Sequence, residues 1–149
     1  MKFSMEMMDE VISKLRDKDN KAAYEYAKQL GVESAESDKY LDLIPQFAKL
    51  LTDENSYVRT RGFCLICNQA RWADAGQIES VFDEMSALLY DAKPTVVRMC
   101  LGALHEVALY RPEMADRIIR TVHRIDITKY KDSMSGLIEK DMKELLKIL

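Results

Sequence analysis

The sequence predicts an all-α fold of about four stacked antiparallel helix pairs, and three observations lead to this fold class. The 149 residues include only five Gly and three Pro, and such a composition favours helices over strands. Apolar residues recur with the 3.6-residue period of a helix along most of the chain. One segment near the middle also matches a second segment 38 residues later. We expect a single domain, residues 1–149, which is long enough to bury a core without disulfides.

The first two helix pairs are predicted from the apolar period and from the breaks beside it. The first pair is expected at residues 3–16 and 21–30, with Gly31 as the C-terminal cap and a loop over residues 33–38. The second pair is expected at residues 39–51 and 58–70. Pro45 lies inside the first of these patterns, where it either kinks the helix or marks its true start.

The same pattern continues to the end of the chain. The third pair is expected at residues 77–90 and 95–110, with Asp74 as a possible cap before it. Pro112 suits the first turn of a helix that extends to about Ile125, and the last helix covers residues 134–149. That makes about eight helices in four pairs, and no segment shows the two-residue alternation of a strand.

An ungapped shift of 38 residues aligns the second pair with the third. Matching positions occur in the turn and in both helices: Leu50 with Leu88, Asp53 with Asp91, Val58 with Val96, Ile66 with Leu104, and Trp72 with Tyr110. The repeat unit is therefore helix, short Asp-containing turn, helix. One such pair exposes too much apolar surface to be stable alone, so stacked neighbours must share a continuous core.

The stretches LLTDENSYVRTRGFCLI and LLYDAKPTVVRMCLGAL resemble the signature of HEAT-repeat proteins, and the resemblance covers residues 39–110. That signature has an apolar first helix, an Asp-rich turn, and Val-Arg with small residues opening the second helix. Arg98 lies one place later than the register of Arg59 predicts, and Gly62 and Cys100 stand where the family usually has Ala. The resemblance implies a right-handed α-α superhelix whose second helices line the concave side and bind a protein or peptide.

The motifs do not indicate a catalytic or metal site. Cys64 and Cys67 form a C-x-x-C inside a predicted apolar helix, so we expect them to be core residues rather than a redox or zinc site. His105 and His123 lack the neighbours that a general base requires. The chain has no glycine-rich phosphate loop, G-x-S-x-G or H-E-x-x-H motif. We therefore expect no enzymatic activity, no cofactor and no metal.

Trp72 and Tyr110 occupy the same place in successive repeats, just past the second helix. We expect them to seal each helix pair against its neighbour. The alternative is an aromatic shelf for a peptide or a base.

Six arginines are the candidate partner-binding residues: Arg59, Arg61, Arg98, Arg117, Arg120 and Arg124. The first three lie on second helices, which the resemblance makes the binding side. The last three share one helical face because their spacing is i, i+3, i+7. Arg59, Arg61 and Arg71 form a second, looser basic group, and if stacking aligns these helices, the two groups would form a basic strip for phosphate or an acidic protein surface. The alternative is a solvated face with local ion pairs.

The N-terminal residues, the cysteine count and the net charge indicate where the protein is located and which class of partner it binds. The first ten residues, MKFSMEMMDE, hold no uninterrupted apolar run, so we expect neither a signal peptide nor a membrane anchor. Three cysteines, an odd count, indicate reduced thiols and a cytoplasmic protein. The net charge of −3 disfavours a dedicated duplex-binding module, which is more often basic.

Three functions follow as hypotheses. The first is a non-enzymatic scaffold that binds a protein or peptide. The second is nucleic-acid binding related to the HEAT-like alkylpurine DNA glycosylases, whose catalytic Asp matches no motif in this chain. The third is a helper domain inside an oligomer or larger complex, with the oligomeric state left open.

Overall fold

The computed structural model describes residues 2–149, in which helices are the only regular secondary structure. The α-helices are α1 (Met5–Leu15), α2 (Asn20–Ser34), α3 (Ile44–Lys49), α4 (Ser56–Asn68), α5 (Ala75–Ser86), α6 (Pro94–Tyr110), α7 (Ala115–His123) and α8 (Asp132–Leu146). Short 3₁₀ turns flank them at η1 (Leu41–Leu43), η2 (Leu50–Thr52), η3 (Ala87–Tyr90), η4 (Pro112–Met114) and η5 (Ile127–Lys129).

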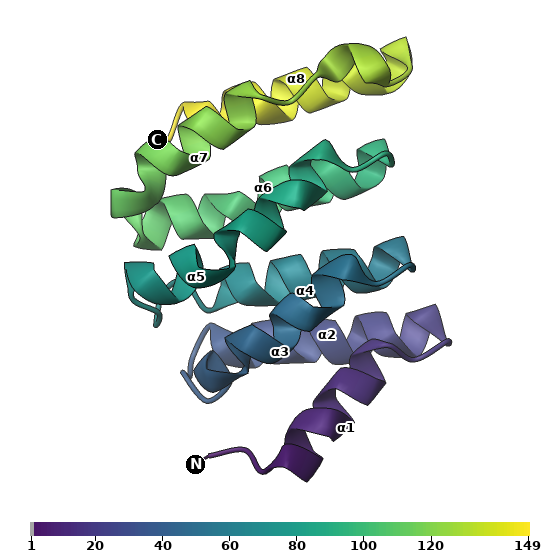
Figure 1. The fold of residues 1–149 in the computed structure, drawn as a ribbon, viewed down its shortest axis with the longest axis vertical. Coiled ribbons are helices and arrows are strands. Elements are labelled where there is room, and N and C mark those ends of the chain that lie inside the picture. The colour runs from purple at the N-terminus through teal and green to yellow at the C-terminus, as the bar shows by residue number, and fades with distance from the viewer. Residues whose placement is uncertain (1) are drawn as a thin grey trace.

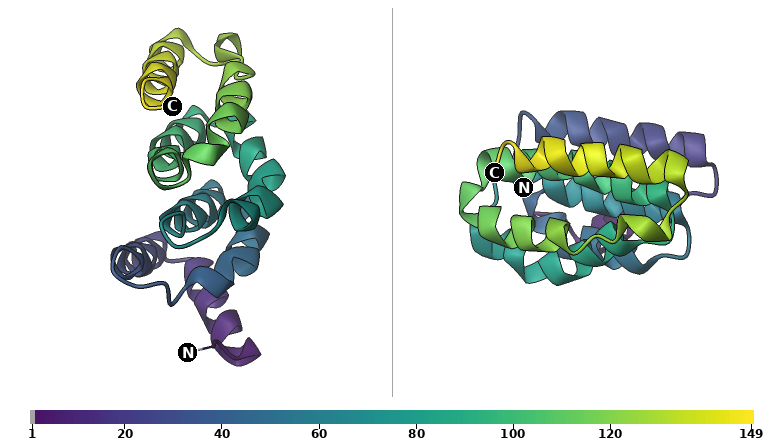
Figure 2. Two further views of the ribbon diagram at one scale, coloured as in Figure 1. Left: turned by 90° about the vertical axis from the view of Figure 1, so that its left-hand side faces the viewer. Right: turned by 90° about the horizontal axis from the view of Figure 1, so that it is seen from above.

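Successive helix pairs stack on one another along the long axis of the molecule (Figure 1). The first helices of the pairs, α1, α3, α5 and α7, form one layer, and the second helices, α2, α4, α6 and α8, form the other (Figure 2). The most extensive contacts between α-helices join neighbours within the second-helix layer. The predicted all-α fold of stacked helix pairs is confirmed, and the right-handed superhelix stays a prediction.

Two helices, α5 and α3, begin where residues near their first turns predict a helix start. Asp74 forms a capping box before α5, because its Oδ1 accepts a hydrogen bond from the Gln77 backbone N–H at 2.8 Å. The Gln77 Oε1 in turn accepts a hydrogen bond from the Asp74 N–H at 3.0 Å. Pro45 lies in the first turn of α3, so of its two predicted roles the helix start is correct.

The predicted end of the second helix at Leu30 is wrong, because α2 continues through Gly31 to Ser34. No glycine in residues 2–149 has a positive φ, so Gly31 is not a left-handed cap. Tertiary contacts extend the helix. Ser34 is fully buried, its hydroxyl donates to the Leu30 carbonyl, and it accepts a hydrogen bond from the Gln69 side chain of α4.

Three predicted helices are divided in the structure, and the one predicted from Pro112 consists of η4 and α7. The segment over residues 39–51 consists of η1, α3 and η2, and the segment over residues 77–90 consists of α5 and η3. Two of the tight turns each bring two consecutive leucines into the core, Leu50 with Leu51 in η2 and Leu88 with Leu89 in η3.

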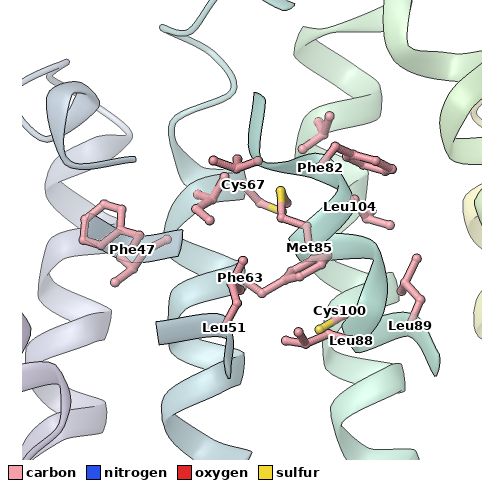
Figure 3. Packing of buried hydrophobic residues seen from close by; sticks show 14 of the residues in the cluster. Phe47, Leu51, Phe63, Cys67, Phe82, Met85, Leu88, Leu89, Cys100 and Leu104 are labelled. Carbon is pink, nitrogen blue, oxygen red and sulfur yellow. The ribbon is translucent and has the colours of Figure 1, made fainter. Parts of the chain in front are cut away.

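The core runs between the two layers through all four pairs. Phe47, Phe63 and Phe82 are among its largest fully buried side chains, and Figure 3 shows them beside the residues that meet between the layers. Gly62 lets α4 approach α3 closely, since a Cβ at this position would lie 2.7 Å from the Phe47 carbonyl oxygen. This contact explains why Gly62 departs from the Ala of the family signature.

Candidate partner-binding surface

Arg59 joins the second and third helix pairs. Its Nη2 lies 2.9 Å from Asp91 Oδ2, and its Nη1 donates to the carbonyl oxygens of Asp53 and Glu54. Both charged side chains are mostly buried, with 17% of the Arg59 and 12% of the Asp91 side chain exposed. Arg59 therefore stabilises the packing of the second helix pair against the third.

Arg98 joins the third and fourth pairs in a different manner. The fourth turn has Lys129 at the repeat position of Asp53 and Asp91, so it offers no carboxylate there. Arg98 instead donates from Nε to Asp141 Oδ2 of α8 at 2.7 Å. Its one-residue offset from the repeat register turns the side chain toward α8, because each residue advances a helix by about 100°.

Arg61 is buried without a carboxylate partner. Its Nη1 donates to the Leu15 carbonyl at 3.0 Å, and its Nη2 reaches the Asn20 carbonyl at 3.3 Å. No ion pair within residues 2–149 includes Arg61. Burial lowers the pKa of this guanidinium, since the surroundings disfavour its charge.

Arg117 and Arg120 of α7, and Arg124 at its C-cap, lie in the first-helix layer, whereas the other three candidates lie in the second-helix layer. Arg117 is half-buried; it donates to Asp83 at 2.7 Å and its guanidinium carbon lies 4.9 Å from the centre of the Phe82 ring. Arg120 and Arg124 are exposed. The arginines of the first-helix layer therefore do not join those of the second helices in one basic strip, because antiparallel pairing places first and second helices on opposite sides of the core. Partner binding by the six candidate arginines stays a prediction.

The second-helix layer instead carries an open groove of about 560 Å³, which we call the α2–α6 groove. Its lining comes from α2, α4 and one side chain of α6, and includes Lys21, Tyr24, Lys28, Tyr57, Cys64 and Met99. The left view of Figure 2 shows α2, α4 and α6 as neighbours in the second-helix layer. The volume lies within the range of ligand pockets, about 300–1,000 Å³.

Large apolar side chains stand exposed in this groove. Tyr24 is 56% exposed, Tyr57 62% and Met99 55%. Scattered exposed apolar residues are common on proteins, but three that line one concavity mark an interaction site more strongly. Aromatic residues and Met are also enriched in protein interfaces.

Positive charge surrounds these apolar side chains. Lys21 and Lys28 are exposed on α2, and the buried Arg61 contributes to the lining between α2 and α4. Among the described residues no Asp or Glu lines the groove. Glu106 of α6 contacts the lining at Asn68, whose Nδ2 donates to its carboxylate at 3.0 Å. The groove is thus more positive than the chain as a whole.

The cysteines lie where the sequence places core residues, with one difference. Cys67 and Cys100 are buried, and burial raises the pKa of both thiols well above the ordinary value. Cys64 is half-buried at the groove, where burial, with a smaller effect of the Glu106 charge, raises its pKa to about 11. A thiol with such a pKa is a poor nucleophile at neutral pH.

Trp72 and Tyr110 contact neighbouring pairs, as expected for sealing residues. The Trp72 indole N–H donates to the Ser34 carbonyl of the preceding pair at 2.6 Å. The Tyr110 ring lies 4.7 Å from the Arg71 guanidinium carbon, again in the preceding pair. The prediction that they seal the repeats is confirmed.

The groove residues were not predicted from the sequence. The apolar period of residues 21–30 includes Ala23, Tyr24, Ala27 and Leu30, yet only Ala23 and Leu30 of these are buried. A signal did exist at Met99, which takes the repeat position of Arg61 and so lies outside the pattern of repeated apolar residues.

Two further features describe the chain. Within residues 2–149, His, Cys, Asp and Glu side chains form no group of three or more that could hold a metal ion. None of the helices in the described part combines the length and the apolar character that a membrane crossing requires. His105 is half-buried on α6 and His123 is exposed at the end of α7.

Comparison with known proteins identifies the family. No curated protein and no solved structure gives a significant match to the chain. One family model matches residues 35–149, which is more than half of the chain. This helical family is of the HEAT-repeat type, so the resemblance seen in the sequence is confirmed. The chain therefore belongs to the Cnd1 family, described as non-SMC mitotic condensation complex subunit 1.

Proposed function

We propose that this chain is a non-enzymatic helical scaffold that binds a segment of a partner protein in the α2–α6 groove. The observation that carries the proposal is the exposure of Tyr24, Tyr57 and Met99 together in one concavity of the second-helix layer. Grooves that present apolar side chains suit peptide segments, whose own side chains fill them.

The family supports a protein partner. Its description names a subunit of a complex, and a subunit needs at least one surface that another chain covers. The nucleic-acid alternative has less support, since Arg59, Arg98 and Arg117 are engaged with carboxylates of the chain itself. A cytoplasmic location stays a prediction from the cysteine count, and a single domain over residues 1–149 stays part of this proposal.

The test compares groove variants with matched variants elsewhere on the same helices. Tyr24→Glu and Met99→Glu place charges in the groove, on α2 and α6 respectively. Val32→Glu and Leu109→Glu are the controls, because Val32 on α2 is 58% and Leu109 on α6 is 68% exposed, and neither lines the groove. All four positions are exposed, so each variant should fold, which circular dichroism checks.

Each immobilised protein is incubated with nuclease-treated lysate of the source cells, and bound proteins are identified by mass spectrometry. We expect a defined protein on the wild type and on both controls that is lost from both groove variants. Purified partner should then reproduce this pattern in a titration. Equal recovery by groove and control variants would contradict the proposal, as would recovery of nucleic acid alone from untreated lysate.

A further inference from the structure

We infer that the segment bound in the α2–α6 groove is acidic, with carboxylates that flank an apolar side chain. This inference rests on the proposed function, because it specifies the chemistry of the partner at the same groove. It follows from the charges at the groove, their spacing and the position of the exposed apolar residues between them.

The groove carries more positive than negative charge, because three cations line it and the one carboxylate shown to contact its lining, Glu106, accepts a hydrogen bond from Asn68. Lys21, Lys28 and Arg61 all line it, and none of them takes part in an ion pair within the described residues. The hydrogen bonds of Arg61 go to neutral oxygens of Leu15 and Asn20. Since the whole chain is acidic, with a net charge of −3, this local excess of positive charge is not a consequence of composition.

Two other arginines of the second helices, by contrast, are neutralised by carboxylates of the chain itself. Arg59 pairs with Asp91, and Arg98 pairs with Asp141. In both pairs, a carboxylate neutralises a guanidinium group that joins two stacked helix pairs. A buried cation without a carboxylate partner gains most from an anion supplied by another molecule.

Spacing defines the segment further. Lys21 and Lys28 are seven residues apart on α2, which is about 10.5 Å along the helix axis. In an extended peptide, residues i, i+2 and i+4 share one face, so two carboxylates four residues apart span about 13 Å and flank an apolar side chain on that face, a span that the long lysine side chains can match. Tyr24 lies between the two lysines on the same helix and lines the same groove. A peptide along α2 would therefore place an apolar side chain against Tyr24 while its carboxylates meet the lysines.

The experiment begins with selection of peptides from a random display library on the immobilised full chain. Enriched peptides are synthesised with a fluorescent label, and their dissociation constants are measured by anisotropy. We expect acidic residues on both sides of an apolar or aromatic residue. We also expect affinity to fall with rising salt, since exposed charges are screened.

Charge variants test the lysines against a matched pair. Lys21→Glu combined with Lys28→Glu should weaken binding by about tenfold or more, since like charges then oppose each other. Lys140→Glu combined with Lys147→Glu is the control, because these lysines are also seven residues apart, exposed, and outside the groove. The control introduces the same charge change and should leave the affinity within about twofold, because distant exposed charges are screened.

The outcomes separate this inference from the proposed function. Peptides that lose affinity with Tyr24→Glu and Met99→Glu but have no acidic bias would overturn the inference and leave the groove as a binding site. Equal affinity for the two lysine double variants would overturn it as well. If no selected peptide depends on Tyr24 or Met99, the proposed function itself fails.

Discussion

Arg59 of one helix pair and Asp91 of the next form a two-point contact, with Nε donating to Oδ2 at 3.1 Å and Nη2 to Oδ1 at 3.2 Å. The same guanidinium donates from Nη1 to the Asp53 carbonyl in the turn of its own pair. One side chain therefore fixes two consecutive interhelical turns relative to each other. A planar guanidinium suits this role because its donors point in fixed directions.

The Arg59–Asp91 contact should contribute to stability cooperatively. We expect Arg59→Met and Asp91→Asn each to lower the free energy of unfolding by about 1.5–3 kcal/mol, since each leaves a half-buried charge or carbonyl unpaired. The double variant should lose less than the sum, with a coupling energy of about 1–2 kcal/mol. Urea denaturation of the four proteins measures the cycle, provided that the m-value is constant.

The exposed pair Glu139 and Lys143 on α8 provides the control cycle. Their side chains are 46% and 70% exposed, so solvent screens the interaction. We expect a coupling energy of no more than about 0.5 kcal/mol. Equal coupling in both cycles would show that Arg59 and Asp91 behave as an ordinary surface pair.

Gly62 and Gly102 should respond oppositely to alanine. At Gly62 a Cβ would lie 2.7 Å from the Phe47 carbonyl oxygen and 2.9 Å from Leu50 Cβ, so Gly62→Ala should cost about 1–3 kcal/mol. At Gly102, within α6, a Cβ meets nothing within 4 Å, so Gly102→Ala should stabilise by about 0.5–1 kcal/mol. Thermal and urea unfolding measure both. A stable Gly62→Ala protein would mean that α3 and α4 separate at little cost.

The sequence predicted the layers because burial is periodic. A side chain that repeats every three or four positions must face the core, and this decides which helices exist and how they pair. Helix ends depended on contacts made across the fold, so the extension of α2 to Ser34 followed from Gln69 of α4 and could not be predicted locally. Asp74, by contrast, forms its cap within four residues, and the sequence identified it.

The candidate site was less predictable for a similar reason. Arg59 and Arg98 were chosen for their charge, but the residues that neutralise them lie 32 and 43 positions away. The groove combines side chains from three helices, and Tyr24 and Met99 belong to different repeats. The composition and the apolar period of a segment describe a single helix. A groove forms only when several helices pack together, so neither property predicts it.

The three thiols should be unreactive in the folded protein. Burial raises the pKa of Cys64 to about 11, so very little thiolate exists at pH 8. We expect slow alkylation by iodoacetamide at pH 8 and rapid modification of all three cysteines in urea, measured by mass spectrometry. Rapid modification of Cys64 in the folded state would contradict its environment in the structure.

The same pKa values predict how stability depends on pH. A thiol whose pKa is higher in the folded than in the unfolded state favours folding fully below the unfolded value, near 8.5. That contribution is lost as the pH rises from there toward the folded value of about 11. Cys64→Ala should therefore flatten the fall in unfolding free energy between about pH 8.5 and pH 11. If the unfolding free energy of the wild type and of Cys64→Ala falls equally with pH, the pKa of the Cys64 thiol is not raised in the folded protein.

Arg120 of α7 and Arg124 at its C-cap remain candidates for contact with a partner, since both are exposed. Arg120→Glu combined with Arg124→Glu should change the free energy of unfolding by no more than about 0.5 kcal/mol. Because the acidic chain does not gather its arginines on one face, we expect short duplex DNA to bind only in the nonspecific range, about 10⁻⁴–10⁻⁶ M. Fluorescence anisotropy between about 50 and 200 mM salt measures this. Tighter binding that falls steeply with salt, and that the Glu variant abolishes, would restore the nucleic-acid hypothesis and place its site on α7.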